Sequence, residues 1–377
     1  MKHVDEYRDG AAARALAQRV AAEATRPGYR FMEFCGGHTH AIARYGLADM
    51  LPPSVRMIHG PGCPVCVLPM GRIDEAIALL SRPEVTLCTY ADLMRVPASG
   101  GRSLLQAKAA GADVRMVYST LDALDIARRE PGREIVFFAI GFETTTPPTA
   151  VALHSARDEG LRNFSVFCNH VLTPAAIEAI LGSGEVLLDG FVGPAHVSTV
   201  IGSRPYEPSA HRHRKPVVIA GFEPLDLLQA ILMLVRQVNA GTFEVQNQYI
   251  RAVRAQGNPR ARDVVDSVFE LRDRFEWRGL GFIEHSALRL RESWAAFDAE
   301  RRYAMVPIES ADNRACECGA ILRGVKAPQD CKLFGKVCTP DTPMGSCMVS
   351  SEGACAAHWT YGRHRIAVAA PAAEAAS

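Results

Sequence analysis

The sequence predicts an α/β protein with mainly parallel sheets, followed by a small cysteine-rich domain. Short apolar runs alternate with helix-like stretches up to about residue 240, and several of these stretches start at a polar cap or proline and stop at glycine. Six of the eleven cysteines fall within residues 316–355, a segment rich in glycine and proline and without clear periodicity. Because this segment has few apolar residues of its own for a core, we expect another group to stabilise it.

The elements are expected in a regular order along the chain. An alanine-rich helix covers residues 9–24 and ends before Pro27-Gly28. Eight strands follow, at residues 29–34, 55–59, 85–89, 113–119, 134–140, 164–169, 190–193 and 216–221. Helices are expected between several of them, at residues 71–81, 103–111, 121–130 and 173–184. Residues 245–275 and 293–305 are also predicted to be helical.

These elements predict three parts. Residues 1–130 form an N-terminal helix and a first α/β domain, residues 131–300 a second α/β domain with trailing helices, and residues 301–377 the cysteine-rich domain. A strand followed by Gly-Phe-Glu and a proline-opened helix occurs twice, ending in Glu143 and Glu223. Either each is a favourable strand-to-helix turn, or both turns lie where open α/β sheets bind ligands.

The composition is that of an ordinary globular protein, with 48% hydrophobic and 22% charged residues and a formal net charge of +1. This balance carries no charge signature for nucleic acid or an anionic membrane surface. The N-terminus lacks an apolar signal core, and the most apolar run, residues 227–235, is about half the length that a bilayer span needs. We expect a cytoplasmic protein that binds neither nucleic acid nor membrane.

The cysteines are unevenly distributed. In a reducing compartment, clustered cysteines indicate metal binding or redox catalysis more often than structural disulfides. Cys88 and Cys168 are isolated in apolar strands and are expected to be buried core thiols. The remaining nine cysteines belong to three sequence motifs.

The last motif indicates a site with four cysteine ligands. Its final four cysteines stand seven, nine and eight residues apart: Cys331, Cys338, Cys347 and Cys355. Four thiolates can hold tetrahedral zinc or a cubane iron–sulfur cluster. The wide spacing and the lack of Cys-x-x-Cys knuckles favour the cluster, with zinc as the alternative. Cys316 and Cys318 form a separate Cys-x-Cys pair, so six thiols are available for four positions.

Two earlier motifs carry reactive groups. In GPGCPVC, Cys63 and Cys66 can form a reversible disulfide or bind one soft metal, and the alternative is a purely structural pair. In FCGGHTH, a strand is expected to end at Cys35 and Thr39 to cap a helix over residues 41–50. A thiolate near that helix start can bind a soft metal or attack an electrophile. His38 and His40 could be ligands, acid–base groups or only hydrogen-bond donors.

Four further polar residues lie at predicted loop positions: Asp92, Glu143, His196 and Glu223. They could line a cleft, or they could serve as helix caps and buried hydrogen-bond partners.

The motifs together resemble the HypD family of hydrogenase maturation proteins. The matching segments are FCGGHTH, HGPGCPVCVLP, TYADLMRVP, GFETTTPPTA, GPAHVSTVIG, AGFEPLDLLQAI and the cysteine segment through GSCMVSSEGAC. They extend from about residue 30 to residue 360, and one small departure is Ala91, where the family has glycine.

The resemblance implies two related Rossmann-like α/β domains around a central cleft and a C-terminal helical and irregular domain with a [4Fe–4S] cluster. It implies a monomer within a hetero-complex, in which a small HypC-type chaperone helps to hold iron while an Fe(CN)₂CO unit is assembled. A HypE-type protein donates the cyanide. Cys35 would be the iron ligand with His38 nearby, and Cys63 with Cys66 the redox pair.

The resemblance also implies the cluster ligands, which map to Cys331, Cys338, Cys347 and Cys355, with Cys316 and Cys318 as accessory thiols. We expect a cluster beside the Cys-x-x-Cys pair to supply it with single electrons. One alternative is a stand-alone iron–sulfur-dependent thiol–disulfide oxidoreductase, which would leave Cys35 and both histidines without a role. Another is a zinc-stabilised interaction protein, which would explain only the C-terminal segment.

Overall fold

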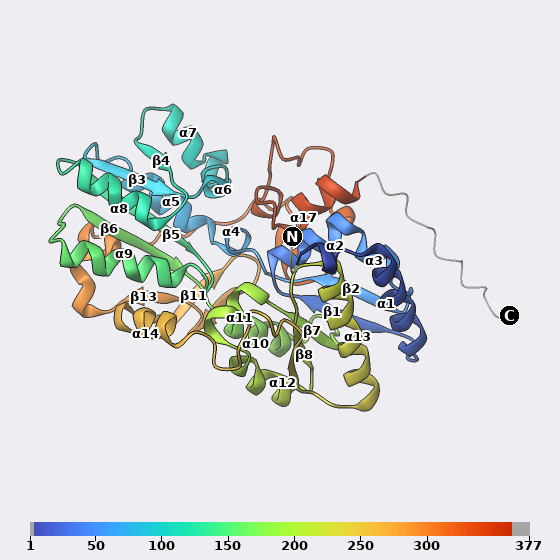
Figure 1. The fold of residues 1–377 in the computed structure, drawn as a ribbon. Coiled ribbons are helices and arrows are strands. Elements are labelled where there is room, and N and C mark those ends of the chain that lie inside the picture. Colours follow the sequence, from blue (N-terminus) through green and yellow to red (C-terminus); the bar gives the residue numbers. More distant parts are fainter. Residues whose placement is uncertain (1–3, 364–377) are drawn as a thin grey trace.

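The computed structural model describes residues 4–363 and contains two parallel β-sheets with helices packed on them (Figure 1). All eight predicted strands form, and the α/β fold class with mainly parallel sheets is confirmed. No helix within the described residues is both long and apolar enough to span a lipid bilayer.

The first sheet has five parallel strands in the order β2-β1-β7-β8-β9. In chain order these are β1 (Tyr29–Glu33), β2 (Val55–His59), β7 (Gly190–Gly193), β8 (Val217–Ile219) and β9 (Val245–Asn247). The second sheet has four parallel strands in the order β4-β3-β5-β6. These are β3 (Val85–Thr89), β4 (Val114–Met116), β5 (Glu134–Gly141) and β6 (Phe164–His170).

The α-helices are distributed along the whole described chain. They are α1 (Gly10–Glu23), α2 (Gly36–Tyr45), α3 (Leu47–Met50), α4 (Pro64–Val67), α5 (Met70–Leu79), α6 (Ala91–Met94), α7 (Leu104–Ala109), α8 (Thr120–Arg129), α9 (Thr146–Asp158), α10 (Thr173–Ser183), α11 (Ala195–Ile201), α12 (Glu207–His213), α13 (Pro224–Ala240), α14 (Pro259–Val268), α15 (Ala299–Arg302), α16 (Cys318–Leu322) and α17 (Ala354–Ala357). Short 3₁₀ helices include η4 (Glu292–Phe297) and η6 (Ser346–Met348).

The strand pairing does not follow the predicted ranges 1–130 and 131–300. The chain begins the first sheet with β1 and β2, builds the whole second sheet, and then returns to place β7 beside β1. Among β1 to β9, consecutive strands therefore lie in different sheets at two points, a long-range pairing that local patterns do not reveal.

The prediction of helix over residues 245–275 is wrong for most of that range. Only α14 is helical there, between β9 and β10 (Phe269–Leu271). β10 pairs with β13 (Leu288–Leu290), and β11 (Arg274–Trp277) forms a hairpin with β12 (Gly281–Glu284). Burial alternates along β11, whose Phe275 and Trp277 point inward, and this period of two favours a strand over a helix.

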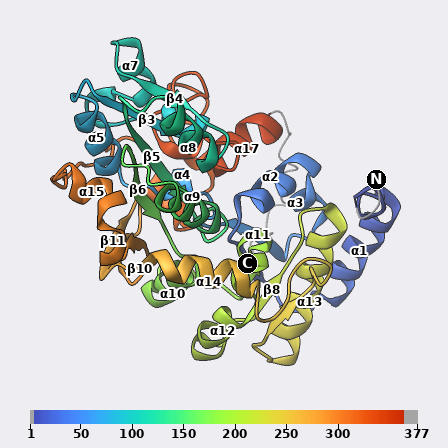
Figure 2. The same cartoon turned by 60° about the vertical axis from the view of Figure 1, so that its left-hand side comes forward.

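A central core joins the two sheets to the C-terminal segment. It contains side chains from the first sheet such as Phe191, from the second sheet such as Phe138, and the cysteines Cys66 and Cys347. In the views of Figure 1 and Figure 2, α17 lies beside α2, with which it is in contact. The C-terminal segment therefore packs on the carboxyl end of β1, where the Cys35 motif begins.

Candidate functional site

Cys35 lies at the junction of β1 and α2. The helix starts at Gly36 rather than after Thr39 as predicted, because the Cys35 carbonyl accepts hydrogen bonds from the His38 and Thr39 N–H groups (2.8 and 3.1 Å). The thiol is buried, and burial raises the pKa of Cys35 to about 12, assisted by the charges of Glu352 and Glu33. The N–H groups of Gly37 and His38 lower this pKa, but burial outweighs them.

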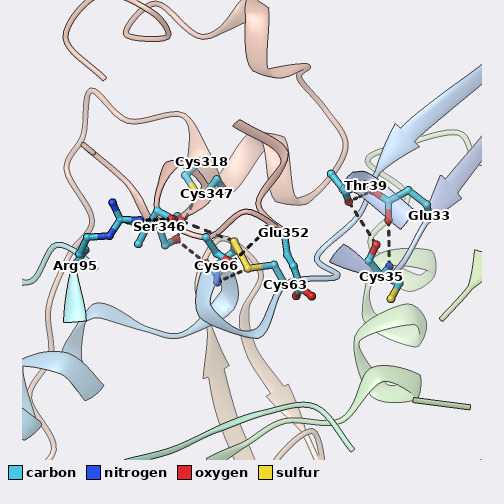
Figure 3. Close-up of a disulfide and its surroundings, with 12 residues drawn as sticks. Glu33, Cys35, Thr39, Cys63, Cys66, Arg95, Cys318, Ser346, Cys347 and Glu352 are labelled. Carbon is cyan, nitrogen blue, oxygen red and sulfur yellow. Dashed lines mark hydrogen bonds between the residues drawn. A yellow bond between two sulfur atoms is a disulfide. The ribbon is translucent and has the colours of Figure 1, made fainter. Parts of the chain in front are cut away.

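The turn is held by Glu33, a fully buried carboxylate on β1 that was missed from the sequence. It accepts hydrogen bonds from the Cys35 N–H (3.1 Å), the Thr39 hydroxyl and His59 Nδ1 (2.9 Å). The Thr39 hydroxyl therefore orients this carboxylate instead of capping a helix, as Figure 3 shows. An isolated glutamate in a strand motif carries no signal that would have identified this role.

His38 is fully buried beside Cys35. Its Nε2 donates to the Ala220 carbonyl (3.0 Å), and its ring lies 5.2 Å from that of Phe222. Burial lowers the pKa of His38, so the ring is neutral near pH 7 and Nδ1 carries a lone pair. Within the described residues, Nδ1 has no hydrogen-bond partner, which leaves it available to a ligand.

Cys63 and Cys66 form a disulfide at the start of α4, and both are buried. The turn that precedes them packs on the Cys35 motif, because the Gly36 N–H donates to the Gly62 carbonyl (2.9 Å). A Cβ atom at position 62 would lie 2.7 Å from Cys35 Cα, so only glycine permits this approach. Two thiol motifs that are separate in the sequence are thus adjacent.

The disulfide turn also touches the cysteine segment, through Ser346 (Figure 3). The Ser346 hydroxyl donates to the Cys66 carbonyl (2.8 Å) and lies 3.7 Å from Cys318 Sγ. Ser346 immediately precedes Cys347 in η6. Ser346 therefore contacts both the disulfide turn and one of the C-terminal thiols.

All six C-terminal cysteines line one small apolar pocket: Cys316, Cys318, Cys331, Cys338, Cys347 and Cys355. Ile321, Leu333, Phe334, Gly345 and Met348 complete its wall. The donor set suits a soft, sulfur-binding group. Within residues 4–363, no three His, Cys, Asp or Glu side chains are arranged so that they could hold a single metal ion. The predicted accessory thiols Cys316 and Cys318 thus share the pocket with the predicted ligands.

Within the pocket, Cys318 is the most closely contacted thiol. Its sulfur lies 2.6 Å from Cys347 Sγ. Hydrogen bonds from Cys316 and Cys347 hold the pKa of Cys318 well below its usual range, and the same contact raises the pKa of Cys347. Contact between these thiols therefore favours the thiolate form of one of them.

Glu143 is a buried hydrogen-bond partner. Its two carboxylate oxygens accept the N–H and the hydroxyl of Thr173 (both 2.9 Å), and burial raises the pKa of Glu143 to about 7. The buried phenol of Tyr206 lies within electrostatic reach of both Glu143 and Cys35. Glu143 and Cys35 are therefore both buried groups near Tyr206.

The other predicted polar residues have different positions. Glu223 is the N-cap residue of α13 and forms an ion pair with Arg8 (2.5 Å). Of the two alternatives for this residue, cleft lining or helix cap, the structure therefore shows the helix cap. His40 Nε2 lies 3.3 Å from the Tyr361 hydroxyl. His196 is exposed and stacks on Phe222, with ring centroids 4.1 Å apart.

Asp92 and Glu352 come from segments that are far apart in the sequence but lie near each other. Asp92 lies in the first turn of α6, within electrostatic reach of Glu352. Glu352 packs on the Cys35 motif so closely that a Cβ atom at Gly36 would lie 2.7 Å from its Oε2. Burial, then Asp92 and Glu33, raises the pKa of Glu352. Glu352 was missed because nothing in the sequence indicates that α17 packs on α2.

Cys88 and Cys168 are buried in β3 and β6, as predicted. Burial raises the pKa of each thiol to about 12, which makes both poor nucleophiles.

The chain is similar to proteins of one family over almost its whole length. The sequence profile described as "Hydrogenase formation hypA family" (HypD) matches residues 11–362. The hydrogenase maturation factor HypD of Rhizobium leguminosarum bv. viciae is 70% identical, over 97% of this chain and 97% of that protein. Those of Azotobacter vinelandii (64% identical, 99% and 100% covered) and Escherichia coli strain K12 (47%, 96% and 98%) are also similar. The chain belongs to the HypD family.

Proposed function

We propose that the protein is a hydrogenase maturation factor in which Cys35 binds the iron of an Fe(CN)₂CO unit during assembly. The Cys63–Cys66 pair is its thiol redox centre, and the C-terminal cysteine pocket holds a [4Fe–4S] cluster. The observation that carries the proposal is the contact between the three thiol motifs. The Gly36–Gly62 hydrogen bond joins the first two, and the Ser346–Cys66 hydrogen bond joins the second and third.

Cys35 supplies a thiolate that forms only when iron replaces its proton. In the iron-free protein the raised pKa keeps the thiol protonated, so binding a ferrous ion releases one proton. Low-spin iron that carries cyanide and carbon monoxide is soft and is well matched to a thiolate. The unpartnered Nδ1 of His38 is a neutral acceptor for a protonated or polar ligand.

The disulfide changes state by taking up two electrons and two protons to give two thiols. An iron–sulfur cluster, when bound, supplies electrons one at a time. Ser346 fixes the Cys66 turn against the pocket, and Gly62 fixes the Cys63 side against Cys35. The Cys63–Cys66 disulfide therefore lies between the cysteine pocket and Cys35, which supports the proposal that it is the redox pair.

The burial of the disulfide disfavours the alternative of a stand-alone oxidoreductase. Cys66 is 0% exposed and Cys63 is 3% exposed, so neither sulfur can be attacked by a protein thiol without a structural change. A redox pair that serves a neighbouring internal site has no such requirement. The HypC-type chaperone and the HypE-type cyanide donor are the partners that the family resemblance implies.

Infrared spectroscopy tests the proposal on protein purified anaerobically together with its HypC-type partner. Bands of metal-bound cyanide and carbon monoxide are expected, and Cys35→Ala should abolish them. The absorption band near roughly 400 nm, expected for a cysteine-ligated cluster, should persist in that variant. Cys88→Ala is the matched control, because this buried thiol lies in β3, and it should keep both signals. A colourless protein that contains zinc would contradict the proposal.

A further inference from the structure

Arg278 is a buried cation that forms an ion pair with Asp312 but has two nitrogen atoms without a hydrogen-bond acceptor among the described residues. Its side chain is only 2% exposed. Within the described residues, Nε and Nη2 have no hydrogen-bond acceptor, and Asp312 Oδ1, 3.1 Å from Nε, does not meet the geometry of a hydrogen bond. A buried guanidinium with unused donors is costly, because it loses its hydration without replacement.

The position of Arg278 is fixed by the backbone on both sides. It lies in the turn of the β11–β12 hairpin, and its N–H donates to the Val67 carbonyl of the disulfide turn (2.7 Å). The next residue, Gly279, packs on Gly319. A Cβ atom added at position 279 would lie 2.6 Å from the Gly319 Cα. Gly319 directly follows Cys318 in α16. The hairpin turn is thus held between the redox pair and the cysteine segment.

The same turn directs Arg278 to the thiols. Arg278 lines a small cavity together with Cys316, Cys318 and Asp312, and both of these cysteines also line the six-cysteine pocket. The unused donors and the thiols therefore line adjoining cavities, which share Cys316 and Cys318. An anionic, sulfur-rich group in the pocket would provide the acceptors that the protein itself does not.

We propose that Arg278 is a positioning residue of the cysteine pocket, where its guanidinium donates hydrogen bonds to the anionic sulfur atoms of an iron–sulfur cluster. This inference rests on the proposed function, because it assumes the cluster. Hydrogen bonds to the sulfurs and nearby charge are among the factors that set a cluster's reduction potential. A buried cation favours the reduced, more negative state, so Arg278 raises the potential.

A redox titration of the anaerobically purified, full-length protein tests this role, followed by visible absorption and electron paramagnetic resonance. Arg278→Met should lower the midpoint potential of the cluster by roughly 59 mV for one electron. At a fixed solution potential, the ratio of reduced to oxidised cluster then falls about tenfold. Arg278→Lys, which keeps the charge but not the planar fork, should shift it less. A wild-type potential in Arg278→Met would overturn the proposal.

Arg323→Met is the matched control. Arg323 Nη1 donates to the Gly279 carbonyl (2.5 Å), so it supports the same turn without lining either cysteine-lined cavity. Its removal should leave the potential unchanged. An equal shift in Arg323→Met and Arg278→Met would show that only the shape of the turn matters, and would also overturn the proposal.

Thermal unfolding of the cluster-free, full-length protein covers the case in which Arg278→Met takes up no cluster. Removing a buried cation that has two unsatisfied nitrogen atoms should raise the melting temperature of this state, because Asp312, its 41% exposed ion-pair partner, stays hydrated. A lower melting temperature would assign Arg278 a structural role and overturn the proposal. Absence of the band near roughly 400 nm in the wild-type protein would contradict the proposed function together with this inference. A wild-type band with an unchanged potential in Arg278→Met contradicts the inference alone.

Discussion

Gly62 packs directly on the backbone of Cys35, and a Cβ atom at position 62 would lie 2.7 Å from Cys35 Cα. Gly62→Ala should therefore force the two thiol motifs apart. We expect it to lower the free energy of unfolding by about 1–3 kcal/mol, the usual cost of overpacking. Chemical denaturation of the oxidised, iron-free protein measures this change.

Gly132→Ala is the control for Gly62→Ala. An added Cβ atom at Gly132 meets nothing within 4 Å, and its backbone is not in the left-handed region. Its effect should stay within about 0.5 kcal/mol. Equal effects of the two substitutions would show that the contact with Cys35 does not constrain position 62.

Glu143 should make stability depend on pH. Burial raises the pKa of Glu143 to about 7 from a reference value of 4.5, so between these values the folded protein keeps a proton that the unfolded chain releases. Stability is full below about pH 4.5 and falls as the pH rises towards 7. Glu143→Gln removes this loss, so relative to wild type it should gain up to about 3 kcal/mol across that range.

Denaturant unfolding at several pH values measures the Glu143→Gln difference. Glu84→Gln, at an exposed position, is the matched control, and its stability should stay within about 0.5 kcal/mol of wild type. A constant difference for Glu143→Gln between pH 4.5 and 7 would contradict the burial of a neutral carboxyl group at position 143.

Cys35 should be slow to alkylate in the iron-free protein. Because its pKa is raised to about 12, the thiolate fraction rises about tenfold per pH unit throughout the range from pH 7 to 9.5. Mass spectrometry after iodoacetamide treatment measures the rate. The free peptide of residues 34–40 is the control, and its rate should level off above its ordinary thiol pKa of about 8.5. The same levelling in the folded protein would show that burial does not control Cys35.

Ser346 should contribute to stability through its hydrogen bond to the Cys66 carbonyl. Ser346→Ala leaves a buried carbonyl without this partner and should cost about 1–2 kcal/mol in the free energy of unfolding. Ser81→Ala removes a similar hydrogen bond, to the Ala78 carbonyl, but on the surface, where water replaces it. It should cost less than about 0.5 kcal/mol. Similar losses in both variants would argue against a special role for the contact between Ser346 and Cys66.

The strands of both parallel sheets were predictable because they are buried on two faces. β5 has seven consecutive buried residues, so its sequence is a continuous apolar run. β9 was missed because its three residues are only half-buried and include two polar side chains. The β11–β12 hairpin was missed because alternation over four residues is too short to distinguish from a charged helix.

The chemical character of the thiol motifs was predictable from the sequence, but their arrangement in space was predictable only in part. Cys35 and Cys63 follow β1 and β2, and the carboxyl ends of adjacent parallel strands meet at one edge of a sheet. The contact between Cys66 and Ser346 spans 280 positions, and no local pattern specifies it. The roles of Glu33 and Glu352 depend on similar tertiary packing.

The chain order of the first sheet sets when the Cys35 site can exist during synthesis. β1 and β2 leave the ribosome first, but β1 lacks its second neighbour until β7 has been made, after the whole second sheet. His38 gains its Ala220 and Phe222 contacts later still, and Glu352 arrives near the end of the chain. Since domains tend to fold as their residues emerge, the second sheet can form early. A nascent chain therefore lacks the complete surroundings of Cys35, the proposed iron ligand, until Glu352 has been synthesised.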